Sequence, residues 1–327
     1  MSNTFQAYQI LAVEQKAVLQ QLTEQDLMDG DVTVRVEYSG LNYKDGLALT
    51  AKAPIVRCFP LIPGIDFAGT VMASENQAFQ KGDPVLLTGY GVGESHHGGF
   101  SERARVKASW LVPLPKGMTT RQAMAVGTAG FTAMRCVMDL EKYGIAPSDG
   151  TLLVTGAAGG VGSIALAILS HLGYRVAAVT GRPEERAYLE ALGAAEVLDR
   201  AAFSEKAPPL AREQWSAAID VAGGNTLANV LSQIQQGGAV AACGLADSMK
   251  LPATVAPFIL RGVALLGISS VMTPMALRQK TWARLVRDLD LQALETQSNE
   301  ISLAELPAAA EAIIAGKIRG RTLVKIG

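Results

Sequence analysis

A run of glycines between two apolar segments is the part of the chain whose residue types and spacing most clearly imply chemistry. The sequence Thr151-Leu-Leu-Val-Thr-Gly-Ala-Ala-Gly-Gly-Val-Gly162 leads into the helical pattern Ser163-Ile-Ala-Leu-Ala-Ile-Leu169. A strand, a glycine turn and a helix N-terminus together present backbone N–H groups to a pyrophosphate. We therefore predict a dinucleotide site whose pyrophosphate is bound by Gly159, Gly160, Val161 and Gly162.

The residues after the next strand indicate which dinucleotide the site prefers. The segment 175–180 has the pattern of a strand and is followed by Gly181 and Arg182. An NAD-binding domain usually has an acidic residue here, which holds the ribose 2′-OH, whereas an arginine suits a 2′-phosphate. We predict that Thr180, Gly181 and Arg182 bind the 2′-phosphate of NADPH, and that Arg200, after the third strand, reaches the adenosine end.

Two other nucleotide motifs contain similar glycine runs. A Walker A loop ends in Gly-Lys-Ser/Thr, but Val161-Gly162-Ser163 has no lysine, so NTP hydrolysis is disfavoured. The segment 155–162 also matches the TGxxxGxG turn of short-chain dehydrogenases, which need a Tyr-x-x-x-Lys pair that none of the seven tyrosines provides. A turn without a ligand is the remaining alternative, and four glycines within 156–162 are a large entropic cost for a mere connection.

The elements that must position this turn belong to two regions of the chain with different sequence patterns. Residues 1 to about 120 contain short alternating segments with glycine and proline between them, which are typical of a small barrel or sandwich. The strands predicted there are 31–38, 64–71, 83–88 and 102–107. After a helix over 121–140, broken at Gly127 and Gly130, strands alternate with helices, which predicts an α/β fold with a doubly wound parallel six-stranded sheet. The predicted strands are 151–155, 175–180, 195–199, 216–221, 238–243 and 264–268, and the helices include 183–192 and 225–236.

The end of the chain resembles the first of these two regions in its sequence pattern. Helices are predicted over 274–289 and 306–315, and the last strand, 321–326, is expected to pair back into the N-terminal domain. We therefore predict one domain from 1–123 and 273–327 and a dinucleotide-binding domain over 124–272, with a ligand cleft between them.

Composition excludes several other classes of protein. The chain has 327 residues and a net charge of −1, which argues against nucleic-acid binding by bulk electrostatics. Its three cysteines form no CxxC pair, so neither a disulfide framework nor a cysteine zinc site is indicated. No apolar run approaches the roughly 18 residues of a membrane span, and the N-terminus lacks a signal-peptide pattern. We predict a cytoplasmic protein with no membrane or nucleic-acid partner.

Motifs along essentially the whole chain resemble the medium-chain dehydrogenase/reductase family. They are the glycine turn and the segments 64–69, 82–85, 98–104, 127–133 and 316–324. The segments 41–45, 89–96, 127–132 and 270–274 resemble the quinone oxidoreductase subgroup, which includes NADPH-dependent acrylyl-CoA reductases. The resemblance implies a GroES-like, β-rich catalytic domain, a Rossmann domain for NADP(H) and a homodimer.

The chain departs from the zinc alcohol dehydrogenases of this family. It has Asn42 in place of their first cysteine ligand, and Gly64-Ile65-Asp66 in place of Gly-His-Glu. The four-cysteine structural lobe is missing. A catalytic zinc needs about three protein ligands, and the only histidines are His96, His97 and His171, so we predict no metal.

Without a metal, the implied chemistry is hydride transfer to a carbon conjugated with a carbonyl. The resemblance places Asn42, Tyr43 and Asp45 beside the nicotinamide. We expect Tyr43 to contact the nicotinamide and to donate a proton, since a phenol is protonated at neutral pH; a structural loop tyrosine is the alternative. Asp45 could donate only with a raised pKa, and could instead be the N-cap of a helix that starts at Gly46. His96 and His97 lie on a loop that either borders the substrate or is simply exposed.

Further cofactor contacts are expected around the strand ends. Thr128, at the inter-domain helix, could bond the carboxamide or a phosphate. Leu245 follows the fifth strand, and Ser269 and Ser270 follow the sixth, at the carboxyl ends where the nicotinamide should lie. Arg319 and Arg321 are additional phosphate candidates.

The function that the resemblance implies most specifically is NADPH-dependent reduction of acrylyl-CoA to propionyl-CoA without zinc. The alternative is an NADPH:quinone oxidoreductase, and a remoter one is a non-enzymatic NADPH-binding structural or RNA-binding protein. A CoA ester would require basic residues for its phosphates, for which Lys52, Arg57 and Lys107 are scattered candidates.

Overall fold

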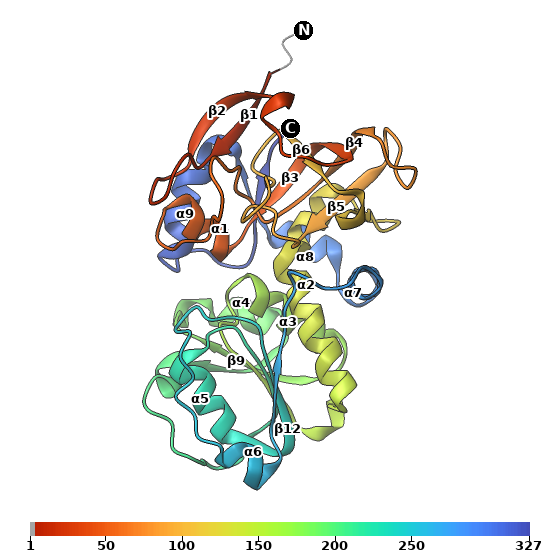
Figure 1. Ribbon diagram of the computed structural model, residues 1–327. Helices are drawn as coiled ribbons and strands as arrows, with labels where there is room; N and C mark the ends of the chain where they lie inside the picture. Colours follow the sequence, from red (N-terminus) through yellow and green to blue (C-terminus); the bar gives the residue numbers. More distant parts are fainter. Residues whose placement is uncertain (1–3) are drawn as a thin grey trace. The chain divides into compact units, whose positions relative to one another are not determined.

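The computed structural model describes residues 4–327 (Figure 1). The first three residues of the N-terminal segment, which we examined for a signal-peptide pattern, lie outside the described residues. The chain divides into two compact units. Unit 1 comprises the chain up to Thr128 together with Ser270–Val286 and Asp290–Gly327, and unit 2 comprises Ala129–Ser269 and Arg287–Leu289. The main division therefore falls a few residues from the predicted domain boundaries.

Unit 2 contains a six-stranded sheet in which every neighbouring pair is parallel. The strand order is β10-β9-β8-β11-β12-β13, which confirms the predicted doubly wound sheet. The order reverses between β8 and β11, and ligands of such sheets bind at the carboxyl ends of the strands at this point. The strands are β8 (Thr151–Val154), β9 (Arg175–Thr180), β10 (Ala194–Asp199), β11 (Trp215–Asp220), β12 (Ile234–Ala242) and β13 (Ala264–Gly267).

Helices cover both faces of this sheet. The crossover through α3 runs from β8 to β9 and that through α5 runs from β11 to β12, in opposite directions along the sheet, so right-handed crossovers place the two helices on opposite faces. Figure 1 shows α5 on one side of the sheet and the second part of α2 on the other. The helices are α2 (Thr120–Tyr143, shared with unit 1), η3 (Pro147–Asp149), α3 (Gly160–His171), η4 (Pro183–Glu185), α4 (Arg186–Ala191), η5 (Arg200–Phe203), α5 (Gly224–Gln233) and α6 (Ala256–Arg261).

Two predicted features of these helices are wrong. The helix predicted over 225–236 ends at Gln233, because Ile234 is buried in extended conformation and pairs with Trp215 as the first residue of β12. Helix α2 is kinked at Gly127 (φ 51°, ψ −158°), as predicted, but it continues through Gly130 without a break. Glycine alone is a weak helix breaker, and tertiary packing decides its conformation.

Unit 1 is built on an antiparallel sheet with the strand order β14-β15-β3-β4-β5-β7, in which only β14 and β15 pair in parallel, and β6 also pairs with β3. The last strand, β15, pairs with β3, which confirms that the end of the chain returns to the N-terminal region. The strands are β1 (Thr4–Gln9) and β2 (Val18–Thr23), which form a separate pair, then β3 (Val32–Leu41), β4 (Asp66–Ser74), β5 (Pro84–Thr88), β6 (Arg103–Val106), β7 (Val112–Pro113), β14 (Asn299–Ser302) and β15 (Thr322–Lys325).

Short helices pack around this sheet. Buried apolar residues of β3, β4 and β5 form one core cluster, and residues of α1 and α9 pack against β15 in another. The helices are η1 (Glu24–Asp26), α1 (Tyr43–Leu49), η2 (Ala108–Trp110), α7 (Met275–Asp288, the end of which belongs to unit 2), α8 (Leu291–Gln297), η6 (Leu303–Glu305) and α9 (Leu306–Ile314). Within residues 4–327, no helix has both the length and the apolar character needed to cross a membrane.

Candidate active site

The glycine turn joins β8 to α3 by a close approach of backbone to backbone. A Cβ on Gly162 would stand 2.4 Å from the carbonyl oxygen of Gly156, so no side chain fits there. Gly156 itself has a φ of 58°, which favours glycine, and Gly159 is the N-cap of α3. The first N–H groups of a helix have no partner inside it, and they carry the positive end of its dipole. The turn therefore fits an anionic group such as a pyrophosphate.

The buried carboxylate of Asp220 is hydrogen-bonded to the segment that leads into the turn. The Thr155 hydroxyl donates to Asp220 Oδ1 at 2.7 Å and accepts from the N–H of Val221 at 3.0 Å. Asp220 Oδ2 accepts from the N–H of Gly223 at 2.8 Å, and burial raises the pKa of this carboxyl group. These bonds fasten the ends of β8 and β11 together at the switch point. Sequence reasoning missed Asp220, although an acid that ends a buried strand is a recognisable signal.

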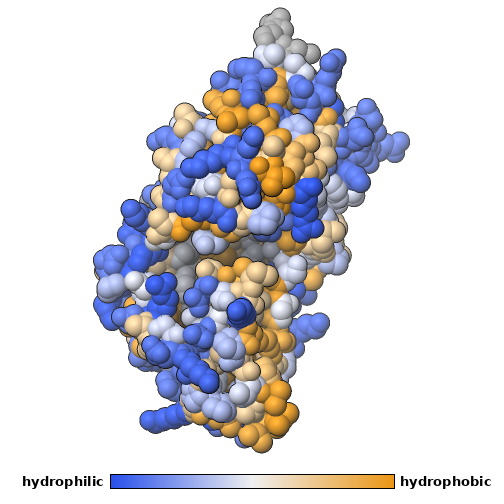
Figure 2. Space-filling view, turned by 60° about the vertical axis from the view of Figure 1, so that its left-hand side comes forward, coloured by the Kyte–Doolittle hydropathy of each residue, from blue (hydrophilic) through white to orange (hydrophobic). Residues whose placement is uncertain are grey.

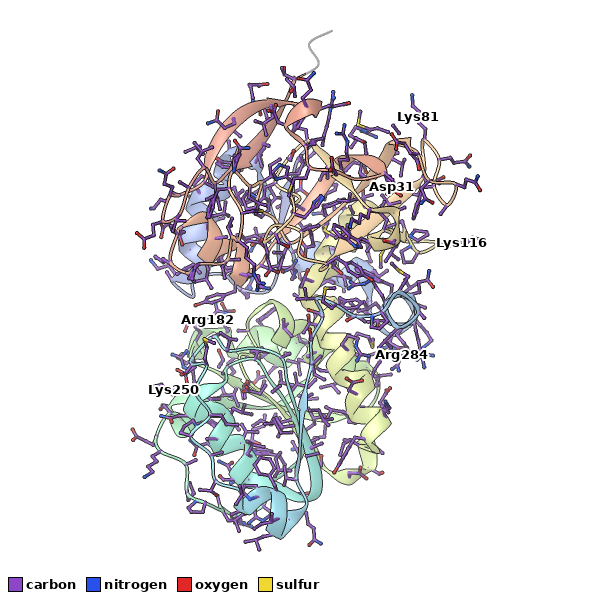
Figure 3. The ribbon with its side chains drawn as sticks, viewed as in Figure 1. Asp31, Lys81, Lys116, Arg182, Lys250 and Arg284 are labelled. Carbon is purple, nitrogen blue, oxygen red and sulfur yellow. The ribbon has the colours of Figure 1, made fainter. Side chains whose placement is uncertain are left out.

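The residues predicted to read the 2′-phosphate lie together beside the turn. Arg182 Nη2 donates to the carbonyl of Ala158 within the turn at 2.9 Å, and the Arg182 N–H donates to Thr180 Oγ1 at 3.1 Å. The guanidinium carbon of Arg200 is 2.8 Å from the place that a Cβ on Gly181 would occupy. Gly181 thus leaves room for a second guanidinium group. Figure 3 shows Arg182 at the end of unit 2 that carries α4.

The residues predicted to contact the cofactor after the fifth and sixth strands are divided between the two units. Leu245 is 58% exposed, and its Cα is 3.3 Å from the place of a Cβ on Gly223, so the loop after β12 packs at the start of α5. Ser269 is exposed and belongs to unit 2. Ser270 belongs to unit 1, where its carbonyl accepts from Arg278, and Arg319 is exposed in the same unit.

In unit 1, Asn42 lies at the centre of a buried polar network. Its Nδ2 donates to Asp45 Oδ2 and to Asp66 Oδ2, both at 3.0 Å, and its Oδ1 accepts from Arg321 Nη1 at 3.0 Å. Both the amide nitrogen and the amide oxygen are thereby engaged within the protein. Asn42 is also the N-cap residue of α1. The network therefore fixes the start of α1, where Tyr43 is the first helical residue.

Asp45 is a buried carboxylate at the third position of α1. Its Oδ2 accepts from the Asn42 N–H and its Oδ1 from the Ile65 N–H, both at 2.9 Å. Burial, together with the negative charge of Asp66, raises the pKa of Asp45 to about 7. The alternative that Asp45 is the N-cap of a helix starting at Gly46 is wrong, because α1 begins at Tyr43.

Arg321 and Asp66 replace the helical bonds that are lost at the Gly127 kink. In a continuous helix the carbonyls of Met124 and Ala125 accept from residues 128 and 129. Here they accept from Arg321 Nη2 at 3.3 Å and Nε at 3.1 Å, while the Thr128 N–H donates to Asp66 Oδ2 at 2.7 Å.

Gly127 also makes room for this arrangement, because a Cβ there would stand 2.6 Å from Arg321 Nη2. Burial lowers the pKa of Arg321, and the charges of Asp66 and Asp45 oppose that shift. The structure thus places Arg321 inside the protein, which corrects its prediction as a phosphate ligand.

Tyr43 differs from Asn42 and Asp45 in that its side chain reaches the surface, with 41% exposed. The next residue, Lys44, forms an ion pair with Glu94 at 2.9 Å, which ties α1 to the loop after β5. Of the three predicted catalytic residues, Tyr43 is therefore the one with an accessible side chain, while the other two are bonded at the start of its helix.

The histidine pair is buried, so the alternative of an exposed loop is wrong, while a loop that borders the substrate stays a prediction. His96 Nε2 and His97 Nε2 each lie 3.1 Å from a backbone carbonyl, of Asp29 and Asp26 respectively. His97 Nδ1 accepts from the Ile62 N–H at 3.2 Å, and burial lowers the pKa of this ring. Both rings join the loop to the N-terminal part of unit 1.

The surroundings of Asn42 do not suit zinc. The amide hydrogens of Asn42 face two carboxylates, Ile65 has no donor atom, and the guanidinium of Arg321 lies 3.0 Å from Asn42 Oδ1. A second cation at this place would be repelled. Among the residues that the structure describes, no group of three His, Cys, Asp or Glu side chains is placed to hold a metal ion.

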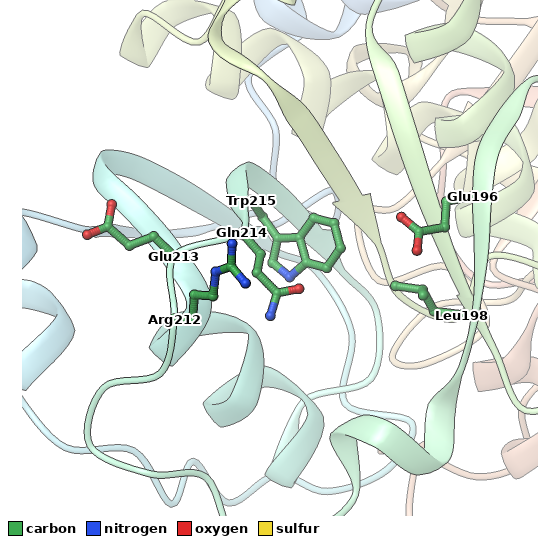
Figure 4. Close-up of a pocket in the computed structure, with 6 residues that line it drawn as sticks. All are labelled: Glu196, Leu198, Arg212, Glu213, Gln214 and Trp215. Carbon is green, nitrogen blue, oxygen red and sulfur yellow. The ribbon is translucent and has the colours of Figure 1, made fainter.

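One open cavity of unit 2 lies away from this chemistry (Figure 4). It has a volume of ≈ 410 Å³ and includes Trp215, the first residue of β11. Because β11 runs parallel to β8, Trp215 stands at the strand end opposite to the glycine turn. The cavity is therefore separate from the glycine turn. Its lining is Glu196, Leu198, Arg212, Glu213, Gln214 and Trp215.

Comparisons with known proteins agree with this arrangement. A family model described as zinc-binding dehydrogenase matches residues 160–289, and one described as alcohol dehydrogenase GroES-like domain matches residues 28–116. The protein named "Probable acrylyl-CoA reductase AcuI" of Escherichia coli (strain K12) is 55% identical over 97% of this chain and 99% of its own length.

Two further similarities bear on the cofactor and the acceptor. "Putative quinone oxidoreductase YhfP" of Bacillus subtilis (strain 168) is 47% identical over the full length of both chains. The crystal structure of the yhdH oxidoreductase from Salmonella enterica in complex with NADP has a TM-score of 0.96 and 55% identity, covering 98% of this chain and 100% of that one.

Proposed function

Because the chain belongs to the medium-chain dehydrogenase/reductase family, we propose that it is an NADPH-dependent reductase of activated C=C bonds, with acrylyl-CoA as substrate and propionyl-CoA as product. The observation that carries this proposal is the near full-length similarity to a protein named as an acrylyl-CoA reductase. The similarity to a protein named as a quinone oxidoreductase supports quinone reduction as the second candidate, since a quinone is also a conjugated acceptor.

We propose that the glycine turn and its neighbours hold NADPH. Gly159, Gly160, Val161 and Gly162 supply the helix N-terminus for the pyrophosphate. We expect the 2′-phosphate to bind beside that turn, next to Thr180 and Gly181. Arg182 and Arg200 offer it two guanidinium groups there. Thr128, Leu245, Ser269, Ser270 and Arg319 remain predicted contacts.

The proposed chemistry needs a hydride, a stabiliser of negative charge and a proton. NADPH supplies the hydride, which adds to the carbon β to the thioester carbonyl. The charge that develops on the carbonyl oxygen requires a hydrogen-bond donor, and the exposed phenol of Tyr43 is suited to donate to it and to supply the proton. Asn42 and Asp45 keep Tyr43 at the start of α1, and in this proposal its phenol takes the role that a zinc ion would have as a Lewis acid.

The test of the acceptor is a direct comparison of kcat/KM with NADPH for acrylyl-CoA and for 1,4-benzoquinone. We expect acrylyl-CoA to be preferred. A preference for the quinone by orders of magnitude would overturn the first candidate. Binding of NADPH without reduction of any enone, thioester or quinone would instead favour the non-enzymatic alternative.

The role of Tyr43 is tested by Tyr43→Phe, which removes only the hydroxyl group. We expect kcat to fall about a hundredfold to ten-thousandfold while the affinity for NADPH changes little. Lys44→Met, which breaks the neighbouring ion pair with Glu94, is the control and should retain most of kcat. Equal losses in the two variants would contradict a role for the hydroxyl.

The chemistry of CoA adds a requirement that the structure meets only in part. Lys52 pairs with Glu311 at 3.1 Å, and Lys107 lies 5.3 Å from the ring centre of Trp110. Arg57 is exposed, and its backbone N–H donates to the carbonyl of Glu94, the partner of Lys44. The three basic candidates therefore contact different parts of unit 1. Lys52 is the one bonded directly to α1, since its N–H donates to the carbonyl of Leu47 at 3.0 Å.

We further propose that the protein is a homodimer. Val255, Ile259 and Leu260, in and beside α6, are 66%, 73% and 65% exposed, and β13 is an edge strand of its sheet. Figure 2 shows an apolar area at the lower end of unit 2, where Figure 1 places α6. Such a patch next to an open edge supports association with a second copy. Light scattering should give twice the chain mass, and Ile259→Asp should reduce it; a monomeric wild-type protein would refute the proposal.

We also propose a cytoplasmic location. Cys58, Cys136 and Cys243 are free thiols, as is usual in a reducing compartment. Fractionation of cells that express the protein tests the location, and recovery outside the cytoplasm would refute it.

A further inference from the structure

Two of the three cysteines lie together inside unit 2, although they are far apart in the sequence. Cys136 is on the second part of α2, and Cys243 directly follows β12. The Cys136 thiol donates a hydrogen bond to the sulfur of Cys243. The Cys243 thiol in turn donates to the carbonyl of Asp220 at 3.5 Å. We name Cys136 and Cys243 the dithiol pair.

The packing of α2 explains why the two thiols meet. Tyr143 lies about two turns after Cys136 on the same face of the helix. Its hydroxyl donates to the carbonyl of Gly262 at 3.5 Å, just before β13 begins. Since β13 pairs with β12, this face of α2 lies beside the two strands. Regular secondary structure within one unit therefore brings the dithiol pair together.

The two thiols differ in their access to solvent. Cys136 is fully buried, whereas Cys243 is half-buried. The hydrogen bond that Cys136 donates to Cys243, together with burial, raises the pKa of the Cys136 thiol. Oxidation of a cysteine requires exposure and starts from the thiolate. An oxidant from the solvent therefore meets Cys243 first, and Cys136 lies behind it as the thiol to which it is bonded.

A short chain of bonds joins Cys243 to the glycine turn. The Cys243 N–H donates to the carbonyl of Asp220 at 2.9 Å, the same carbonyl that its thiol contacts. The carboxylate of Asp220 accepts from the hydroxyl of Thr155 at 2.7 Å, and Thr155 is the residue before Gly156. A movement of Cys243 is thus transmitted to the segment that leads into the turn.

The loop after Cys243 is also in direct backbone contact with the end of β11. A Cβ on Gly244 would stand 2.2 Å from the carbonyl oxygen of Val221, and the Asp247 N–H donates to the carbonyl of Ala222 at 2.8 Å. These contacts leave little room for Cys243 to move independently of β11. The carboxyl end of β11 is beside the switch point of the sheet, where ligands of this fold bind.

We propose that the dithiol pair is an oxidation site, at which hydrogen peroxide converts the two thiols into an intramolecular disulfide that weakens the binding of NADPH. The Cys243 sulfur attacks one peroxide oxygen, the O–O bond breaks, and the other oxygen leaves as water with the thiol proton. The Cys136 sulfur then attacks the sulfenic acid on Cys243. The S–S bond forms, the S–O bond breaks, and a second water leaves with the Cys136 proton. Two thiols are oxidised and one peroxide is reduced to two waters.

The effect on the cofactor follows from the geometry of a disulfide. Its two sulfur atoms are about 2.05 Å apart, much closer than two hydrogen-bonded thiols. Cys136 and Cys243 must therefore approach each other when the bond forms, which pulls on Asp220 and on the loop after β12. This part of the inference rests on the proposed function, since it takes NADPH as the ligand of the glycine turn.

The first experiment counts thiols in the variant Cys58→Ser, which retains the dithiol pair and lacks the third cysteine. After treatment with hydrogen peroxide, we expect both thiols to disappear and a non-reduced digest to contain a peptide that links Cys136 to Cys243. Dithiothreitol should restore both thiols. Two intact thiols, or a sulfinic acid on Cys243 without the linked peptide, would overturn the inference.

The second experiment measures the dissociation constant for NADPH by fluorescence titration of the reduced and the oxidised protein. We expect oxidation to raise it about tenfold to a hundredfold, because a misplacement of about 1 Å in a site has effects of this size. Dithiothreitol should reverse the change. Cys243→Ser should be insensitive to peroxide, and so should Cys136→Ala; if the latter does not fold, Cys243→Ser provides the test. Cys58→Ser should respond like the wild type.

The inference and the proposed function fail in different ways. A disulfide that changes the dissociation constant by less than about twofold would overturn the effect on the cofactor. A reduced wild-type protein that binds no NADPH would overturn the proposed function, while the thiol count would still decide whether the dithiol pair is an oxidation site.

Discussion

The glycine turn of unit 2 and the Asn42 network of unit 1 achieve rigidity in opposite ways. The turn occupies one short stretch of chain, and it depends on the absence of side chains at Gly156 and Gly162. The network joins residues from distant parts of the chain, Asn42, Asp66 and Arg321, through side chains that are all buried. The turn uses partial charges that every helix N-terminus already carries, whereas the network must compensate full charges in the interior.

Both regions contain a glycine at a critical place, for different reasons. Gly162 lets one backbone segment approach another, and Gly127 lets a guanidinium group approach a kinked helix. A surface that fits an anion can thus be made locally, while the support of an exposed side chain such as Tyr43 requires charges held by several elements.

The largest effect is expected from removing the cation of the network. Arg321→Met leaves Asp66 and Asp45 buried without their positive neighbour and leaves the carbonyls of Met124 and Ala125 without a donor. We expect the free energy of unfolding to fall by about 3 to 5 kcal/mol, the usual cost of breaking a buried charge pair. Urea unfolding measures this loss. Arg319→Met, at a nearby exposed position, should change stability little, and a loss below about 1 kcal/mol for Arg321→Met would contradict the network.

The pH dependence of stability tests the same network at Asp45. Its pKa is about 7 in the folded protein, well above the value in an unfolded chain, so the folded protein binds this proton more tightly. The resulting stability is present at low pH and is lost as the pH rises through 7. Relative to Asp45→Asn, the wild type should lose about 2 to 3 kcal/mol between pH 5 and pH 8. Parallel stability curves for the two proteins would show that Asp45 does not titrate in this range.

A third prediction concerns the backbone of the turn. Gly162→Ala brings a Cβ within 2.4 Å of the Gly156 carbonyl oxygen, so the turn must shift. We expect the dissociation constant for NADPH to rise about tenfold to a hundredfold, because the N–H groups lose their alignment. Gly267→Ala in β13, where a Cβ would meet no atom within 4 Å, is the matched control. Similar fluorescence titrations for both variants would indicate that the turn does not bind the cofactor.

The smallest effect is expected at the edge of the cofactor site. Arg182→Ala should weaken NADPH binding by about tenfold more than NADH binding, because a single charge-assisted contact to the 2′-phosphate is lost. Arg175→Ala, at the opposite end of β9, serves as the control. Equal losses for the two cofactors would mean that Arg182 does not recognise the 2′-phosphate.

Most of the fold and part of the site could be predicted from local sequence. The alternation of apolar strands and helices predicted the parallel sheet, and the return of the last strand to the N-terminal region is confirmed. The glycine turn could be predicted because its conformation depends on consecutive residues. The family is confirmed by its relatives, while the individual site residues remain predictions.

The errors occurred where distant parts of the chain decide the outcome. Gly127 and Gly130 look alike in the sequence, yet only Gly127 is kinked, because Arg321 and Asp66 bond the groups that the kink exposes. The histidines appeared exposed because the N-terminal segment that covers them lies almost 70 residues earlier.

The sequence by itself determined the sheet, the glycine turn and the group of residues around Tyr43, because periodicity and turn chemistry act over a few residues. Only the tertiary structure decided that Tyr43 reaches the surface while Asn42 and Asp45 are buried beneath it. The physical reason is that burial and charge compensation depend on neighbours from other segments. A local pattern specifies which groups are present, and packing specifies which of them are free to react.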